Sequence, residues 1–203
     1  AFTLWPDRSE DRARRTLSDT IYRLRAVFDD DAPWLVADAD GLELVDIDVD
    51  LWTFRSLADG ETADDLPRAI AMHRGPLADG IDDEWVTLPR RAHHERVVAL
   101  CEQACTTLPL ADRLAIAERW AEIDPWATEP HRTLVTTLLA LDRRDAARRT
   151  IDHYRSVLDD LGIDDPDIER WAAMATEAPP PAAPFVGRVA ERGRLVRALD
   201  AAC

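Results

Sequence analysis

The chain has 203 residues, of which 46% are hydrophobic and 32% are charged, and its formal net charge is −15. This length is enough for one large domain or two small ones with a buried core. So acidic a chain does not bind nucleic acid or a membrane surface over its whole body, although one basic face is compatible with it. Local charge therefore has to be followed along the sequence.

The sequence shows no sign of a membrane-spanning or secretory segment. No run approaches the roughly 20 apolar residues of a spanning helix, and the first residues lack the basic start and apolar core of a signal peptide. Of the three cysteines, two lie in one predicted helix and the third is the last residue, which gives no disulfide framework. We expect a soluble cytoplasmic protein with no membrane partner.

The first predicted element is an amphipathic helix that begins after Ser9 and ends near Phe28. Leu17, Ile21 and Leu24 recur at i, i+4 and i+7, so they share one apolar face. The other side carries groups suited to phosphate oxygens and base edges: Arg14, Arg15, Ser18, Tyr22, Arg23 and Arg25. Between residues 7 and 25, six arginines against four acidic residues give a local charge of +2. This basic helix is the leading candidate for a functional surface.

A β-hairpin is predicted next. Residues 34–36 and 42–45 flank Asp40-Gly41, which is a good short-range hairpin signal. The tip, Asp38-Ala39-Asp40, is acidic and therefore ill suited to gripping a phosphate backbone.

From Leu51 onward the pattern predicts helices alone, separated in most places by glycine or proline. The predicted ranges are 51–58, 64–73, 83–107, 110–123, 128–141, 145–161 and 167–176. Residues 121–125 are echoed by residues 161–166, about forty positions later. Helix pairs repeating at this period predict a tetratricopeptide-like array.

The last part of the chain differs in composition. Residues 178–184 are rich in proline and predict a stiff, extended linker. Residues 185–203 begin a new amphipathic helix, and we expect the chain to be a fragment of a longer polypeptide.

The order of these motifs resembles SARP-type bacterial transcriptional activators. Residues 4–7, 13–17 and 21–25 are similar to the second half of their winged-helix DNA-binding domain. Residues 45–54, the Gly75–Gly80 loop and Asp83-Glu84-Trp85 look like the junction and loop of their bacterial transcriptional activator domain. The resemblance implies a mainly α protein, a tetratricopeptide-like array preceded by a partial winged helix. Its implied divisions are half of a winged helix (1–50), the activator domain (51–177), a linker (178–184) and the start of a nucleotide-binding domain (185–203).

The resemblance also implies roles for the residues of the first helix. Arg15 and Thr16 match a pair that engages phosphate at the helix start, whereas Arg14, Ser18, Tyr22 and Arg23 would face the groove and Arg25 would reach the DNA backbone. Asp19 departs from a phosphate-binding surface. It would either accept a hydrogen bond from cytosine N4 or pair with Arg15 or Arg23 along the helix, and the second is favoured.

Three further expectations follow from the resemblance. The family's winged helix opens with a small sheet and a first helix that this chain lacks, so Leu17, Ile21 and Leu24 should be exposed or packed elsewhere, and the chain alone should bind DNA weakly. No phosphate-binding loop is present, so neither ATP nor another cofactor is expected. The implied partners are promoter DNA in the intact protein, and RNA polymerase or a second copy through the helical domain.

Other interpretations carry less support. His94, Cys101 and Cys105 share a helical face, which is a metal-site pattern, but the same stripe carries core residues and favours packing. The histidines have no nucleophile partner at a catalytic spacing, so no enzyme is predicted. The alternative function is a helical protein-interaction scaffold without DNA binding, in which Trp126, in a turn between helices, is the tryptophan most suited to contact a partner.

Overall fold

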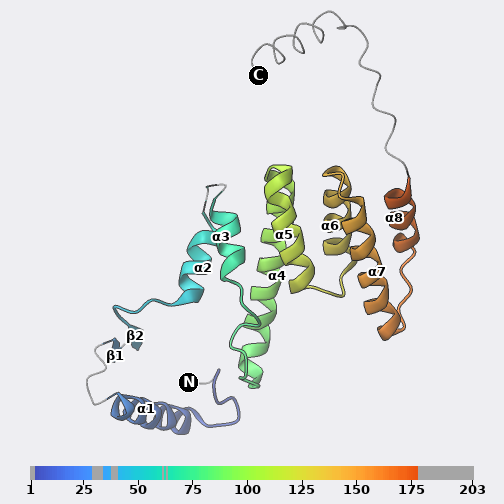
Figure 1. The fold of residues 1–203 in the computed structure, drawn as a ribbon. Coiled ribbons are helices and arrows are strands. Elements are labelled where there is room, and N and C mark those ends of the chain that lie inside the picture. Colours follow the sequence, from blue (N-terminus) through green and yellow to red (C-terminus); the bar gives the residue numbers. More distant parts are fainter. Residues whose placement is uncertain (1–2, 29–33, 38–40, 61, 63, 178–203) are drawn as a thin grey trace, which may run out of the picture.

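The computed structural model describes residues 3–28, 34–37, 41–60, 62 and 64–177, and within these it is mainly helical (Figure 1). Its helices are α1 (Glu10–Val27), α2 (Asp50–Ala58), α3 (Asp65–Met72), α4 (Glu84–Thr107), α5 (Leu110–Ile123), α6 (Thr128–Ala140), α7 (Arg144–Leu161) and α8 (Asp167–Thr176). Strands β1 (Leu35–Ala37) and β2 (Leu42–Leu44) form a hairpin between α1 and α2. The predicted fold class and the predicted helices are confirmed, with ends that differ by one or two residues.

Helix α1 begins where the sequence predicts. Ser9 is its N-cap in an extended conformation, Glu10 and Asp11 occupy the first turn, and Arg25 lies in the last turn, as the helix dipole favours. The helix ends at Val27. Ala13 is the fully buried residue of this helix, so α1 is held by little packing in comparison with the later helices.

The hairpin is antiparallel, with Leu35 opposite Leu44 and Ala37 opposite Leu42. It is fastened to α1 at two points. Arg25 Nη2 donates a hydrogen bond to the Leu35 carbonyl at 2.9 Å, and the rings of Phe28 and Trp34 meet edge to face with centroids 5.3 Å apart. The acidic tip predicted at residues 38–40 lies outside the described residues.

The remaining helices form one array in which each packs on its neighbours in sequence, with α2–α3, α4–α5 and α6–α7 as pairs and α8 at the end (Figure 1). Their apolar faces share one continuous core, whose largest fully buried side chains are Trp120, Trp171 and Tyr154. Because aromatic side chains bury the most apolar area, these three contribute strongly to the stability of the array.

The predicted forty-residue repeat coincides with two turns of the array. Asp124-Pro125 follows α5, and Asp165-Pro166 follows α7. Helix α7 stops at Gly162, whose φ of 68° is a left-handed conformation that glycine adopts without strain. The Thr128 hydroxyl donates to Asp165 Oδ2 at 2.9 Å, so the second turn is tied to the start of α6.

In the part of the chain that the structure describes, no helix combines the length and the hydropathy required to cross a bilayer. The linker and the final helix predicted at residues 178–203 lie outside the described residues.

Candidate nucleic-acid interface

The exposed side of α1 carries arginines whose side chains have no hydrogen-bond or ion-pair partner among the described residues. Within the described residues, the side chains of Arg12, Arg15 and Arg23 make no hydrogen bond or ion pair. Tyr22 stands beside them with 73% of its surface exposed. At 100° per residue Arg15 and Tyr22 lie opposite Ala13, and Arg12 and Arg23 lie on one flank, roughly 100° and 80° from Ala13 around the helix axis. These four side chains form a basic surface open to a ligand. Together with Arg14 we call them the α1 basic face.

The polar residues at the edge of this face are partly engaged. Arg14 pairs with Glu10 at 2.7 Å across one helical turn, and both side chains are exposed, so the pair is weak. Arg8 donates to the Thr16 hydroxyl at 2.6 Å. The hydroxyls of Thr16 and Ser18 donate to backbone carbonyls one turn earlier, at 2.9 and 3.1 Å. To donate to a phosphate oxygen, either hydroxyl would first have to turn away from its backbone carbonyl.

Arg25 has a structural contact that the sequence did not reveal. One of its N–H groups is committed to the Leu35 carbonyl, so the residue sets the angle between α1 and the hairpin. A guanidinium carries five N–H donors, and four of them are left by this contact.

The prediction that Asp19 pairs with Arg15 or Arg23 is wrong. No ion pair joins Asp19 to Arg15 or Arg23, although the carboxylate lies between them on the helix surface. The physical reason is that an exposed ion pair gains little over hydration while it restricts two flexible side chains. With respect to the described residues, Asp19 therefore stands as an unpaired negative charge within the α1 basic face.

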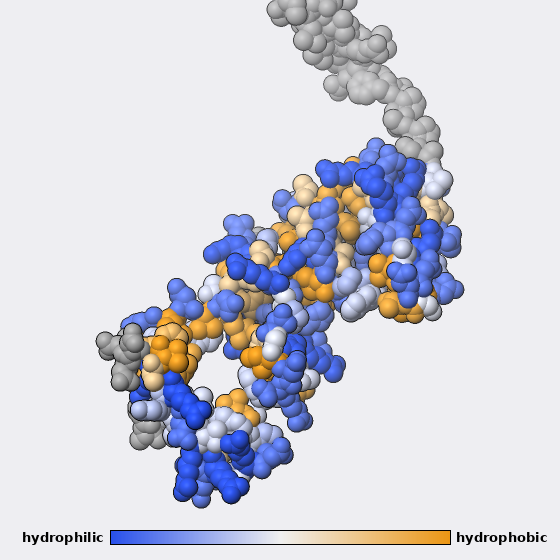
Figure 2. All heavy atoms as spheres, turned by 60° about the horizontal axis from the view of Figure 1, so that its bottom comes forward, coloured by the Kyte–Doolittle hydropathy of each residue, from blue (hydrophilic) through white to orange (hydrophobic). Residues whose placement is uncertain are grey.

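The apolar side of the same unit is incompletely covered, as expected. Leu17 and Ile21 are half-buried, whereas Leu24 is 39% exposed. On the hairpin, Val36, Leu42 and Leu44 are also exposed. Figure 2 shows apolar atoms in orange on the N-terminal part of the molecule, next to hydrophilic atoms in blue.

The comparison with known protein families decides the identity of the helical array. The sequence matches the family described as bacterial transcriptional activator domain over residues 49–172, more than half of the chain. The chain belongs to this family. The resemblance to SARP-type activators found in the sequence is thereby confirmed.

A solved structure supports the fold of the activator-domain chain. Mycobacterium tuberculosis EmbR, in complex with a low-affinity phosphopeptide, is similar with a TM-score of 0.52 and 21% sequence identity. The match covers 98% of this chain and 59% of the EmbR chain, so the chain spans less than two thirds of that protein. A search among curated proteins gave no match.

Of the three candidate metal residues of the activator domain, the two cysteines belong to its core, whereas His94 is half-buried outside it. Cys101 and Cys105 are buried in the main apolar cluster. Burial raises the pKa of the Cys101 thiol to about 12 and that of Cys105 to about 11, so both stay protonated near neutral pH. Among the described residues, no group of three His, Cys, Asp or Glu side chains is arranged to hold a metal ion.

One cluster of potential binding residues is missed by sequence reasoning. His73 Nδ1 lies 3.4 Å from His93 Nε2, and Arg74 and Arg119 line the same surface pocket, whose volume is about 520 Å³. These residues come from the α3–α4 connection, α4 and α5, so no local spacing in the sequence could have brought them together.

Proposed function

We propose that this chain is part of a bacterial transcriptional regulator that binds promoter DNA through α1 and the β1–β2 hairpin, used as the recognition helix and wing of a winged helix. The helical array would serve regulation, self-association or contact with RNA polymerase. The proposal is supported by the family of residues 49–172 and by the basic character of α1.

The observation that carries the DNA-binding part is the set of α1 arginines that have no partner among the described residues. A guanidinium that pairs with no carboxylate can bind phosphate and release counterions without first breaking an ion pair. In the proposal, Arg15 and Thr16 contact phosphate, Arg14, Ser18, Tyr22 and Arg23 face the groove, and Arg25 reaches the DNA backbone with the donors that Leu35 leaves free.

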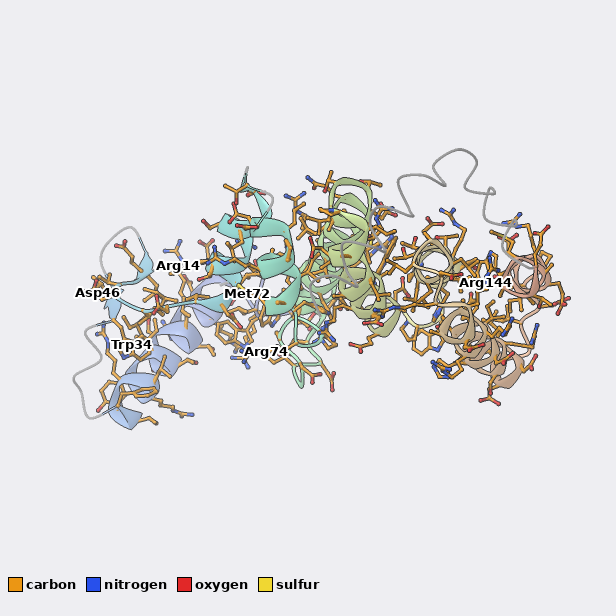
Figure 3. All side chains as sticks on the ribbon, turned by 45° about the horizontal axis from the view of Figure 1, so that its top comes forward. Arg14, Trp34, Asp46, Met72, Arg74 and Arg144 are labelled. Carbon is orange, nitrogen blue, oxygen red and sulfur yellow. The ribbon has the colours of Figure 1, made fainter. Side chains whose placement is uncertain are left out.

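The orientation of the hairpin is the second support. Because Arg25 and the Phe28–Trp34 contact hold the hairpin against the end of α1, the two elements are presented as one unit. In Figure 3, Trp34 and Asp46 lie in this unit, away from the array in which Arg144 lies. A helix and a hairpin fixed in this way can enter a groove and flank it.

The test is a DNA titration of the whole protein encoded by the gene, beside the 203-residue chain, against its own promoter and an unrelated duplex at two salt concentrations. We expect the whole protein to prefer its promoter and to lose affinity as salt rises. Arg15→Ala should weaken binding to both duplexes and reduce the salt slope by about one. Arg23→Ala should cost about 1–3 kcal/mol and reduce the preference for the promoter.

The matched control is Arg170→Ala, which removes an exposed arginine from α8 in the array, where it pairs with Asp167 at 3.0 Å. This change should leave DNA affinity unaltered. Equal and feeble binding to both duplexes, unaffected by the α1 changes, would refute the DNA-binding proposal.

A helical interaction scaffold is the alternative function, and the exposure of tryptophan favours it. Trp126, in the α5–α6 turn, is 64% exposed, and Trp52 on α2 is 47% exposed. Exposed aromatic side chains are common anchors of protein interfaces. If the α1 changes leave promoter activity intact while Trp126→Ala abolishes it, the scaffold describes the protein better.

A further inference from the structure

A strongly cationic pocket lies within the acidic helical array. It is formed by the α3–α4 connection, the first half of α4 and the end of α5. Four arginines and three histidines line it, against one carboxylate, that of Glu122. In a chain with a formal net charge of −15, this concentration of positive charge is the opposite of the average surface.

Part of this charge holds the pocket in shape. The Arg90 guanidinium donates to the carbonyls of Leu77, Ala78 and Ile81, each at 2.9 Å. Ala78 has a φ of 53°, a left-handed conformation that is unfavourable for a residue with a Cβ. Arg90 therefore fixes a strained connection against α4. Since carbonyls carry no net charge, the positive charge of Arg90 has no carboxylate partner in the described part of the chain.

Arg119 plays a similar part from α5. One end of its guanidinium donates to the His73 carbonyl, and the other end pairs with Glu122 at 2.8 Å. The wall of the pocket is thus positioned from three elements before any ligand arrives, which lowers the entropic cost of binding.

Arg74 is different, because it serves no structural purpose in the described residues. It follows directly on His73 after the end of α3 (Figure 3), and its side chain makes no hydrogen bond or ion pair there. Arg91 is also available to a ligand, because its ion pair with Glu95 on the same helix is exposed and therefore weak. Two guanidinium groups are consequently available at the edge of the pocket.

The imidazoles of His73 and His93, on the inner side of the pocket, add hydrogen-bond donors. His73 and His93 lie 3.4 Å apart through Nδ1 and Nε2, so at most one proton lies between them and each ring keeps a second nitrogen. Burial, followed by the neighbouring positive charge of His93 and Arg119, lowers the pKa of His73. Burial and the positive charge of Arg55 lower the pKa of His93, against the opposing effect of Asp50. An anion in the pocket would relieve this repulsion.

The pocket also has an apolar side, made by Pro76, Leu77 and Ile123. A volume of about 520 Å³ falls within the range of small-molecule sites. We propose that this pocket binds a small organic molecule that carries a phosphate or diphosphate group, with Arg74 and Arg91 on the phosphate oxygens and the apolar side against the organic part. Arginine suits this role because its planar fork matches phosphate oxygens. The proposal concerns the helical array alone and does not rest on DNA binding.

The test uses inorganic pyrophosphate as the probe, titrated into the 203-residue chain at 150 mM salt and followed by calorimetry and by NMR of the imidazole signals. We expect saturable binding, with shifts of the His73, His93 and His94 signals. His131 and His153 lie outside the pocket and serve as internal controls. The signals of His73 and His93 should move toward the protonated form, because the anion raises both pKa values.

Three variants complete the test. Arg74→Ala and Arg91→Ala should each weaken pyrophosphate binding roughly tenfold while leaving the unfolding midpoint unchanged. Arg68→Ala removes a nearby exposed arginine of α3 that does not line the pocket, and it should have no effect on binding. The proposal is overturned if millimolar pyrophosphate shifts none of the three pocket histidines, or if Arg68→Ala weakens binding as much as Arg74→Ala does. The second outcome would indicate general attraction between an anion and surface charge.

Discussion

His131 and Tyr154 stack face to face inside the helical array, with ring centroids 4.0 Å apart and planes within 19° of parallel. His131 Nε2 lies 2.9 Å from the Pro125 carbonyl, which can only accept, so this nitrogen carries the proton. Nδ1 of the same ring is buried and finds no partner among the residues that the structure describes. The stack therefore links the α5–α6 turn to α7 through a neutral imidazole.

The first prediction concerns pH. Burial lowers the pKa of His131, and the Pro125 carbonyl opposes this effect only in part; the pKa values of His73 and His93 are lowered too. Because the unfolded chain binds protons at higher pH than the folded chain does, stability should be greatest above the unfolded pKa of about 6.5 and should fall as pH drops below it. Urea unfolding at pH 7.5 and pH 5.5 measures this difference.

The control for that measurement is His131→Gln, which can still donate to the Pro125 carbonyl but does not titrate. It should reduce the loss of stability at pH 5.5 without removing it, because His73 and His93 still contribute. An unchanged pH dependence in this variant would show that His131 is not a source of it.

The second prediction separates two tryptophans that are six positions apart. Trp120 is 1% exposed and lies in the main core, whereas Trp126 is 64% exposed. Trp120→Ala should lower the free energy of unfolding by about 3–5 kcal/mol, since it leaves a large cavity. Trp126→Ala should change it by less than about 0.5 kcal/mol. Denaturant unfolding of both variants decides the matter, and equal losses would contradict the packing described.

The third prediction concerns thiol reactivity. Because burial raises the pKa values of Cys101 and Cys105 to about 12 and about 11, little thiolate is present at pH 8. In a Cys203→Ser background, which leaves these two thiols, reaction with a chromogenic disulfide should be slow in buffer and rapid in 6 M guanidinium chloride, a concentration on the order of that needed for full unfolding. Rapid reaction of the folded protein would mean that the helices around α4 open readily.

The fourth prediction concerns Asp19. As an unpaired carboxylate within the α1 basic face, it should repel phosphate, so Asp19→Ala should raise the affinity of the whole protein for an unrelated duplex by roughly threefold to tenfold at low salt. The effect should fade at high salt, because exposed charges are screened. If Asp19→Ala instead lowered the affinity for the promoter alone, Asp19 would be identified as a partner of cytosine N4.

Local sequence predicted the elements that depend on local chemistry. The spacing of Leu17, Ile21 and Leu24 indicated the apolar side of α1, and Asp40-Gly41 indicated the hairpin. Glycine and proline marked most of the helix ends, because they act within one or two residues of the position they occupy. The order of these elements was enough to recognise the family that residues 49–172 match.

The cationic pocket and the state of individual side chains depended on packing. His73 and Arg119 are 46 positions apart, and they meet because α5 and the α3–α4 connection both contact α4. The same holds for Trp120 and Trp126, whose chemistry is identical while their burial is opposite. Helical periodicity fixes which residues share a face, because it is a property of one segment. Which faces meet, and which charged groups are left without a partner, is decided by the tertiary structure, because contacts between distant segments follow from how whole helices pack.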